Sequence, residues 1–421
     1  MFNSTPLGEI ALIKQGRYLA AADLNETKTE QSPIPVWGAN GLLGYTANST
    51  YESPQPLVTC RGNGCGLVQW TGGPANISNN SMAIVLQDAE TYASRYLYYC
   101  LLSTDFSDVT TGSAQPQITV THLKNKQIFW TDNPLDQKAI AHILGTLDNK
   151  IELNRKTSET LEGIAKAFFK SWFLDFDPVR AKAEGRPTGL SKEISDLFPD
   201  SFEDSELGEI PKGWKVMNIS EVSEVVDCLH SKKPNLLDEG FNFLELKNIR
   251  DDFLLDTLNV SKISESDYQK WISRIEVCSG DLIITNVGRV GAVARVPDNF
   301  FGSIGRNITA IRPKEKSKNS FFLASYFSST LFKSEKRLNV DTGTILDALN
   351  VKDIPKLRFF YPSSEILSNF EEQVSRIWQR REMILEENNN LSKLRDTLLP
   401  KLISGELKIS DAENLVEETS T

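Results

Sequence analysis

The chain lacks the features that mark membrane, secreted and zinc-binding proteins. Its 421 residues include no run of about 18 apolar residues that could cross a bilayer. The N-terminal residues show no basic stretch followed by an apolar stretch, as a secretory signal would. The cysteines form no CxxC pair, and the histidines, His122, His142 and His230, are far apart. These absences predict a cytoplasmic protein with reduced thiols, no membrane contact and no metal site.

Sequence signatures of catalysis and nucleotide binding are also missing. The chain contains no FxGxG fingerprint for S-adenosylmethionine, no Asn-Pro-Pro-aromatic box for amino methylation and no GxxxxGK[ST] phosphate loop. The stretch Gly288-Arg289-Val290-Gly291 is too short for a dinucleotide motif and lies between two predicted strands. We therefore predict that the chain is not an enzyme and holds no cofactor of its own.

The net charge of −10 is distributed unevenly along the chain. Residues 207–361 contain 22 basic and 20 acidic residues, whereas residues 362–421 contain 7 basic and 12 acidic residues. Binding to nucleic acid requires a local positive potential and not a basic total. The composition therefore neither supports nor excludes nucleic acid as a partner.

The chain repeats itself once, weakly, across most of its length. Residues 59–62 recur as residues 285–288 and residues 80–84 as residues 306–310, both at an offset of 226. Near the start, residues 8–11 align with residues 220–223 at an offset of 212. That alignment fits the others better than the letter-for-letter match of residues 7–10 with 207–210, at an offset of 200. A two-copy repeat indicates one scaffold that presents two different surfaces.

Each copy has the pattern of a mixed α/β domain. Short β-branched runs are separated by glycine, asparagine and proline, which is typical of strands and turns. The strands expected in the first copy cover residues 56–59, 66–70 and 82–86, followed by a helix at 93–102. The strands expected in the second copy cover residues 281–285, 292–296 and 307–311, followed by a helix at 321–333.

A long helix is predicted after each copy. The first begins at Asn133-Pro134, and its apolar residues step by fours and threes, with a polar break at Asn154 and Ser158. The second shows the same stepping from Phe370 to Leu398, and Pro400 should end or kink it. Matched registers predict that the two helices pack as an antiparallel coiled coil, about 57 Å long for 38 residues. Residues 175–208 read as a linker and the tail from Asp411 as disordered.

Two stretches carry a resemblance to a known family. The sequence FFKSWFLDFDPVRAKAEG (residues 168–185) resembles the central conserved region of type I restriction-modification specificity subunits. The sequence LFPDSFEDSELGEIPKGW (residues 197–214) is similar to the passage that opens the second recognition domain in that family. The resemblance implies an α+β fold with two target recognition domains in tandem, separated by the two helices. The implied domains are residues 1–133 and 207–361 for recognition, the helical region and linker 134–206, and the distal helix and tail 362–421.

The resemblance also implies partners. Members of this family read a bipartite site in double-stranded DNA and dock two modification subunits, to which restriction and translocation subunits are added. S-adenosylmethionine is then expected on the modification subunit, which methylates adenine, and ATP and magnesium on the restriction subunit. Two alternatives stay open. One is a related system in which methylase and nuclease share one partner chain, and the other is a repeat scaffold that binds no nucleic acid.

Candidate DNA-reading residues follow from the chemistry of base edges. Arginine and lysine suit guanine, asparagine and glutamine suit adenine, and backbone amides at glycines suit phosphates. The base-reading candidates are Arg61, Asn63, Gln69, Asn79, Asn80, Lys247, Arg250, Asn286, Arg289, Arg306 and Asn307. The phosphate-contact candidates are Gly112, Ser113, Gly343 and Thr344. The alternative is that these are turn residues and solvated charges.

An aromatic group closes the first long helix. Phe168 and Trp172 fall on the seam and are expected to pack against the second helix. Phe169 and Phe173 fall beside the seam. We therefore predict that these two side chains form an interface with a methyltransferase partner.

Overall fold

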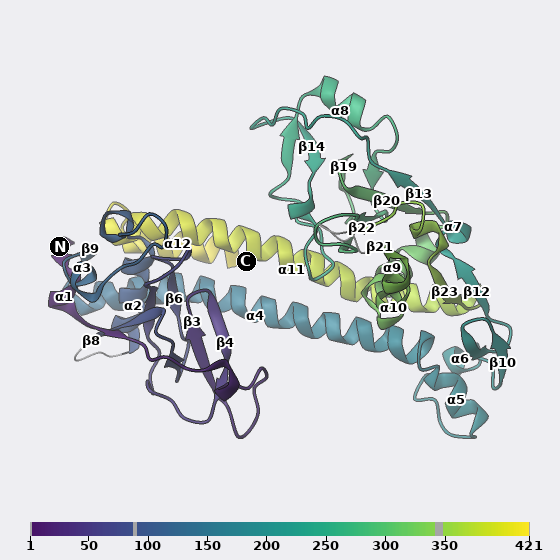
Figure 1. The fold of residues 1–421 in the computed structure, drawn as a ribbon, viewed down its shortest axis with the longest axis horizontal. Helices are drawn as coiled ribbons and strands as arrows, with labels where there is room; N and C mark the ends of the chain where they lie inside the picture. Colours follow the sequence, from purple (N-terminus) through teal and green to yellow (C-terminus); the bar gives the residue numbers. More distant parts are fainter. Residues whose placement is uncertain (1, 87–90, 342–347, 421) are drawn as a thin grey trace. The chain divides into compact units, whose positions relative to one another are not determined.

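The computed structural model describes residues 2–86, 91–341 and 348–420, which divide into two compact units. Unit 1 comprises Met1–Glu152 with Asn390–Thr421, and unit 2 comprises Leu153–Asn389. Each unit combines small β-sheets with helices (Figure 1). No helix of the described residues is long and apolar enough to cross a membrane.

Unit 1 is built on a four-stranded antiparallel sheet. Its strand order is β2-β8-β5-β6, and buried side chains such as Val58 and Ile84 face the core. The strands of this sheet are β2 (Ala11–Gln15), β5 (Pro56–Thr59), β6 (Val68–Trp70) and β8 (Ser81–Leu86). A smaller sheet and a ribbon add β3 (Ile34–Gly38), β4 (Gly41–Thr46), β7 (Asn76–Ile77), β1 (Asn3–Pro6) and β9 (Gln127–Trp130). The short helices are α1 (Leu7–Ile10), η1 (Ala21–Asp23), α2 (Thr91–Leu102), η2 (Ser107–Val109) and α3 (Val120–Lys124).

Unit 2 contains a second four-stranded antiparallel sheet, with the order β13-β20-β17-β18. Its strands are β13 (Ser223–Asp227), β17 (Leu282–Thr285), β18 (Val293–Arg295) and β20 (Ile308–Pro313). The smaller sheet has the order β15-β14-β19-β16, with β14 (Phe241–Leu244), β15 (Ser261–Ile263), β16 (Val277–Cys278) and β19 (Phe301–Ile304). Three two-stranded ribbons are β10 (Phe202–Ser205) with β11 (Gly208–Pro211), β12 (Lys215–Asn218) with β23 (Arg358–Tyr361), and β21 (Val340–Asp341) with β22 (Ala348–Leu349). The short helices are α5 (Asp177–Ala183), α6 (Lys192–Ser195), α7 (Ile219–Val222), η3 (Leu246–Asn248), α8 (Glu265–Trp271), α9 (Lys316–Ser328), α10 (Thr330–Asn339) and η4 (Ile354–Lys356).

The two units repeat one topology, as the sequence predicted. Both main sheets have the same order and strand directions, and both smaller sheets contain one parallel pair, β3 with β7 and β14 with β19. Helix α1 of unit 1 and helix α7 of unit 2 are held alike, because Leu7 N donates to Lys126 O at 2.9 Å and Ile219 N to Leu357 O at 3.0 Å. Helix α7 therefore corresponds to α1 at the predicted offset of 212. The identical residues 207–210 lie instead in the β10–β11 hairpin.

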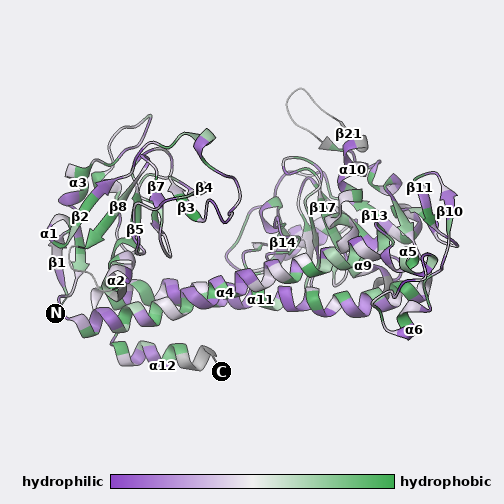
Figure 2. Cartoon of the chain, turned by 90° about the horizontal axis from the view of Figure 1, so that it is seen from below, coloured by the Kyte–Doolittle hydropathy of each residue, from purple (hydrophilic) through white to green (hydrophobic). Residues whose placement is uncertain are grey.

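The long helices are α4 (Pro134–Phe173) and α11 (Ser364–Ser404), and apolar and polar residues alternate along both (Figure 2). In unit 1 the start of α4, with Ile140 and Leu144, packs with the end of α11, with Leu398 and Leu402. In unit 2 the end of α4 packs with the start of α11, as Trp172 does with Phe370 at 6.0 Å between ring centroids. The predicted antiparallel packing is confirmed. The expected Asn133 cap is also present, since its Oδ1 accepts a hydrogen bond from Leu135 N at 3.1 Å.

The structure excludes one of the two expected effects of Pro400, the end of the helix, and corrects two further expectations. Helix α11 continues past Pro400 to Ser404, because Leu402 and Ile403 of its last turn are buried in the unit 1 core, and it ends at Gly405 in the left-handed region. The helix expected at 321–333 is two helices that meet at Ser329. The tail is not disordered but forms α12 (Ile409–Ser420).

The tail and the linker both contribute apolar side chains to a core. In the tail, Ala412 is fully buried, and Ile409 packs against the unit 1 core. The 175–208 segment contains α5 and α6 and buries Phe198 in the core of unit 2. In the sequence these few apolar residues lie among charged ones, so the two segments were predicted to be a linker and a disordered tail.

Candidate nucleic-acid interface

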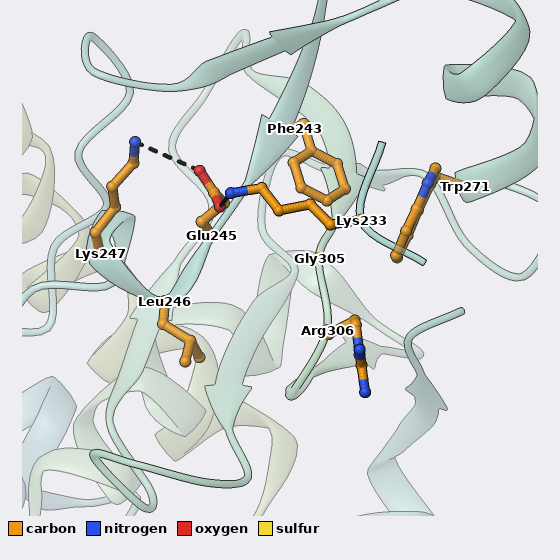
Figure 3. A pocket seen from close by; sticks show the side chains of 8 residues that line it. All are labelled: Lys233, Phe243, Glu245, Leu246, Lys247, Trp271, Gly305 and Arg306. Atoms are coloured by element: carbon orange, nitrogen blue, oxygen red, sulfur yellow. Dashed lines mark hydrogen bonds and ion pairs between the residues drawn. The ribbon is translucent and has the colours of Figure 1, made fainter. Parts of the chain in front are cut away.

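Two hollows on unit 2 bring together residues that the sequence singled out. The first, which we name the aromatic pocket, has a volume of about 250 Å³ and is lined by Lys233, Phe243, Glu245, Leu246, Lys247, Trp271, Gly305 and Arg306 (Figure 3). The second, which we name the arginine hollow, has a volume of about 700 Å³ and is lined by Leu246, Lys247, Ile249, Arg250, Asp251, Asp252, Thr285, Gly288 and Arg289. Leu246 and Lys247 line both, so the two hollows adjoin each other. Four predicted readers, Lys247, Arg250, Arg289 and Arg306, thus belong to one surface.

The turn η3 positions Lys247 at the junction of the hollows. Its neighbour Asn248 is fully buried, and the Asn248 side chain accepts a hydrogen bond from Glu245 N at 2.8 Å. The Asn248 amide donates to Asp256 O at 3.3 Å and Asn259 O at 3.1 Å. Because Asn248 is used internally to fix the turn, the adjacent Lys247 is held facing solvent.

The two arginines of the arginine hollow are each paired with a neighbouring aspartate. Arg289 donates to Asp251 and to the backbone oxygens of Ile249 and Leu246, the last at 3.1 Å. Arg250 donates from Nε and Nη2 to the Asp252 carboxylate, each at 3.0 Å, and this hydrogen bonding raises the pKa of Arg250. Both guanidinium groups are therefore fixed in place, and both remain exposed enough to meet a phosphate or a base edge.

Unit 1 brings its candidates together by backbone hydrogen bonds. Gly62 N donates to Pro116 O at 3.0 Å, so the exposed residues Arg61 and Asn63 lie beside the turn at Gly112 and Ser113. Gly112 has φ of 86°, a left-handed conformation that favours glycine.

The second predicted cluster of unit 1 joins the first in the same way. Cys60 N donates to Asn80 O at 2.8 Å, and Cys60 O accepts from Ile118 N at 3.0 Å. In unit 2, Asn286 N donates to Asn307 O and Asn286 O accepts from Leu349 N, both at 2.9 Å. The two units thus share one backbone frame at this site, and Asn79, Asn80, Arg306 and Asn307 stand on equivalent segments. Asn307 itself has a left-handed φ of 64°.

Two predicted base readers must be corrected. Gln69 is 8% exposed, and its Nε2 donates to Gly38 O at 2.9 Å and to Thr59 Oγ1 at 3.2 Å. Asn286 is 6% exposed; its Nδ2 donates to Leu349 O at 3.3 Å and its Oδ1 accepts from Thr309 at 3.0 Å. Both amides brace neighbouring loops and cannot reach a base edge. Gly343 and Thr344 lie outside the described residues.

The predicted partner interface at Phe169 and Phe173 is also wrong. These side chains are 2% and 1% exposed. Phe169 contacts Phe322 at 5.6 Å between ring centroids, and Phe173 contacts Phe370 at 4.8 Å. The prediction assumed that α4 packs only against α11, but α9 also packs on this end of α4, so the buried face is wider than the seam.

Of the eight residues that line the aromatic pocket, the sequence predicted Lys247 and Arg306 and missed the other six. Lys233 follows Lys232 in a polar loop, and this lysine pair was a usable signal. Phe243 and Trp271 carry no such signal, because apolar side chains in a strand and a helix usually belong to a core. Only the packing of α8 against β14 places their rings 5.0 Å apart at the wall of a pocket.

Among the residues that the structure describes, one group of possible metal ligands occurs, at the end of β13. The ligand atoms of Asp227, Cys228 and His230 lie within 4.8 Å of one another. Arg274 lies 4.0 Å from the Asp227 carboxylate, and its positive charge opposes a bound cation. Burial raises the pKa of Cys228, which favours the protonated thiol, a poor ligand. His230 is already paired with Asp227 at 2.7 Å, so we interpret the group as an ion-paired turn.

Comparisons with known proteins relate the chain to type I specificity subunits. The family model described as the type I restriction modification DNA specificity domain matches residues 2–163. The HindI specificity subunit of Haemophilus influenzae is 26% identical over 383 residues, which cover 79% of this chain and 81% of that protein. The EcoBI specificity subunit of Escherichia coli is 25% identical over 428 residues, covering 95% and 85% respectively. The crystal structure of a type I restriction-modification S subunit from M. genitalium has the same fold, with a TM-score of 0.62 at 17% identity over 96% of both chains.

Proposed function

Because this chain belongs to the family of type I restriction-modification specificity subunits, we propose that each unit reads one half of a bipartite DNA target. The observation that carries this proposal is the shared backbone frame with different side chains. Cys60 in unit 1 occupies the place of Asn286 in unit 2, and both make the same pair of backbone hydrogen bonds. One frame with two sets of side chains suits two different half-sites.

In unit 2 we assign reading to the surface formed by the aromatic pocket and the arginine hollow. Arginine and lysine side chains meet guanine edges and phosphates, and this surface carries Lys233, Lys247, Arg250, Arg289 and Arg306. In unit 1 the corresponding surface has fewer charges and more amides. Arg61, Asn63, Asn79 and Asn80 lie there beside the Gly112-Ser113 turn, which we assign to a phosphate.

The helices α4 and α11 have two proposed roles. Their paired seams would set the spacing between the half-sites, and their charged outer faces would dock two modification subunits. Those subunits would bind S-adenosylmethionine and methylate adenine, and restriction subunits using ATP and magnesium would complete the complex. This chain would recognise the DNA and would catalyse no reaction of its own. It would act in the cytoplasm, where the DNA is.

A loop exchange tests the division of labour. Residues 61–67 would be replaced by the equivalent loop of a related specificity subunit, with Gln69 kept because its amide braces two neighbouring segments. Mapping of methylated adenines in the host genome should then show a change in one half-site only. The control is an exchange of residues 26–30, an exposed stretch outside the reading surface, which should change neither half. A change in both halves, or in neither, contradicts the proposal.

A further inference from the structure

The turn between β3 and β4 in unit 1 is the counterpart of the turn η3 in unit 2. Strand β3 pairs in parallel with β7 and strand β14 with β19, and Trp37 and Leu244 are the last residues of β3 and β14 in these pairs. Ser78 N donates to Trp37 O at 2.8 Å, and Gly305 N donates to Leu244 O at the same distance. The segments that follow Trp37 and Leu244 therefore start from one backbone frame and lead to the same place in each unit.

This equivalence puts Asn40 in the place of Lys247, since each is the third residue after the shared strand position. In unit 2, Lys247 lines the aromatic pocket together with Arg306 (Figure 3). The residue of unit 1 that corresponds to Arg306 is Asn79, which is already a candidate reader. Asn40 also lies against the candidate reading loop, because a Cβ on Gly64 would lie 2.7 Å from Asn40 Oδ1. Asn40 therefore belongs to the reading surface of unit 1, although the sequence did not single it out.

Buried side chains hold the turn that carries Asn40. Gly38 O accepts hydrogen bonds from Gln69 Nε2 at 2.9 Å and from Ser81 Oγ at 3.0 Å. The next carbonyl oxygen, Ala39 O, accepts from Thr59 Oγ1 at 2.7 Å. All three donor side chains belong to buried residues, so the turn is fixed before DNA binds.

The side-chain amide of Asn40 is available to a ligand. Asn40 is exposed, and its amide makes no hydrogen bond with any residue that the structure describes. The amides of Gln69 and Asn286 differ in this respect, because both are buried and bonded inside the protein. A free amide offers one acceptor oxygen and two donor hydrogens side by side.

We infer that Asn40 reads an adenine of one half-site in the major groove, accepting from the N6 amino group and donating to N7. This inference rests on the proposed DNA-reading function and adds a specificity-determining residue to unit 1. The charge of the equivalent Lys247 suits a phosphate, whereas the neutral amide of Asn40 suits a base edge. The adenine that Asn40 reads is not the methylated one, because a base must leave the stack to be methylated.

The test is methylation mapping in a host strain that carries the complete system. Asn40→Ala should relax one A·T position in the half-site that responds to exchange of residues 61–67. Methylation of sites with another base pair at that position should increase about tenfold relative to the cognate sites. Asn40→Lys should instead favour G·C at the same position, because lysine donates to guanine O6 and N7. The control is Asn48→Ala, at an exposed asparagine beyond the other end of β4, which should leave both half-sites unchanged.

The outcomes separate the inference from the proposed function. If both Asn40 variants keep the wild-type specificity while the exchange of residues 61–67 alters one half-site, the inference alone is overturned. An equal loss of methylation at all sites, with the recognised sequence unchanged, assigns Asn40 to a phosphate and also overturns it. A relaxed position in the other half-site has the same consequence. If the loop exchange and the Asn40 variants all leave the recognised sequence unchanged, the DNA-reading function of unit 1 itself is contradicted. Because Asn40 is exposed, both variants should unfold at the wild-type temperature.

Discussion

Arg381 of helix α11 donates a hydrogen bond from Nη2 to the backbone oxygen of Asp252, at 2.8 Å, inside unit 2. The same nitrogen donates to Glu162 of helix α4 at 2.6 Å. Asp252 in turn binds Arg250 of the arginine hollow through its carboxylate. The next residue, Phe253, has a left-handed φ of 65°. Nζ of Lys166, in α4, lies over the Phe253 ring at 5.0 Å from the ring centroid. Both long helices therefore anchor the loop that presents a predicted DNA reader.

Substitution of Arg381 should destabilise unit 2 strongly. Arg381 is fully buried, so Arg381→Met removes a charge that burial disfavours, but it also breaks the ion pair with Glu162, which keeps Lys166, and the hydrogen bond to Asp252 O. Breaking a buried ion pair by removing one partner costs about 3 kcal/mol. Urea unfolding should show this loss, whereas Arg376→Met, in an exposed pair with Glu372 on the same helix, should cost less than about 0.5 kcal/mol. Equal losses for the two variants would contradict the anchoring role.

Anchoring also predicts an effect on DNA. Without Arg381, the Arg250 loop loses its contact with α11, so Arg381→Met should relax base preference in one half-site. Lysine at this position keeps the charge but is shorter than arginine, so it should not reach both Glu162 and Asp252 equally well. Arg381→Lys should therefore relax base preference less than Arg381→Met does. Methylation mapping of both variants measures this, and a relaxation in both half-sites would speak against the assignment.

Glu371 should make stability depend on pH. Burial raises the pKa of Glu371 from 4.5 to about 7, even though Phe322 N and Phe321 N donate to its carboxylate at 2.7 and 3.2 Å. Because the folded state binds this proton more tightly than the unfolded state, the contribution is complete below pH 4.5 and is lost as pH rises through about 7. The loss amounts to about 3 kcal/mol.

Glutamine stays neutral, so Glu371→Gln should remove this pH dependence. The unfolding free energy of the variant minus that of wild type should increase by about 2 to 3 kcal/mol from acidic pH to about pH 8. The neighbour Glu372→Gln, which alters an exposed pair, provides the control and should show no such gain. Parallel unfolding curves for Glu371→Gln and wild type at both pH values would refute the prediction.

Lys247 should contribute to non-specific DNA affinity. It lies at the junction of the two hollows, and its side chain is exposed. Lys247→Ala should lower the slope of log affinity against log salt by about 1, the effect expected for one lost phosphate contact. Lys212→Ala, at an exposed turn outside the hollows, should leave the slope unchanged.

Asp251 should oppose DNA binding. Its side chain is 87% exposed and pairs with Arg289 in the arginine hollow, so DNA must compete with it. Asp251→Asn removes that competition and should tighten binding to random duplex about two- to fivefold at low salt. The gain should shrink as salt increases, and a filter or fluorescence titration at two salt concentrations would detect it.

The paired helices α4 and α11 should act as a spacer whose length changes by a fixed amount for each heptad removed. The ion pair of Asp148 with Arg395 lies in unit 1 and that of Glu162 with Arg381 in unit 2, separated by 14 residues on each helix. Deleting residues 154–160 and 382–388 together removes one heptad from each and keeps the seams in phase. The spacer between half-sites should shorten by about 10 Å, or about three base pairs. Deletion from α4 alone should put the seams out of register and unfold the chain, and an unchanged spacer in the double deletion would refute the role.

Much of the fold was predictable because its signals are local. The strand at residues 56–59 and the helix that begins at Pro134 follow from alternation, heptad stepping and capping, which neighbouring residues encode. The repeat could be recognised because two copies keep the same buried positions at nearly constant offsets. Thr59 and Thr285, for example, are both fully buried at the ends of equivalent strands.

The candidate site was less predictable, because the identity of a polar residue does not determine whether its side chain faces solvent or the interior. Gln69 and Arg61 looked alike as readers, yet only Arg61 is exposed. Likewise Phe169 and Phe173 lie beside the predicted seam, and only the position of α9 determines that they are buried.

By itself, the sequence determined two copies of one α+β scaffold, the long helices with matched seams and the absence of familiar catalytic signatures. The tertiary structure alone decided which polar residues face solvent, that Phe243 and Trp271 form a pocket beside Lys247, and that Arg381 holds the Arg250 loop. The physical reason is range: periodicity and capping act over a few residues, whereas burial and ion pairing depend on segments that are distant in the sequence. Arg381 and Asp252, 129 residues apart, meet only because the chain has folded.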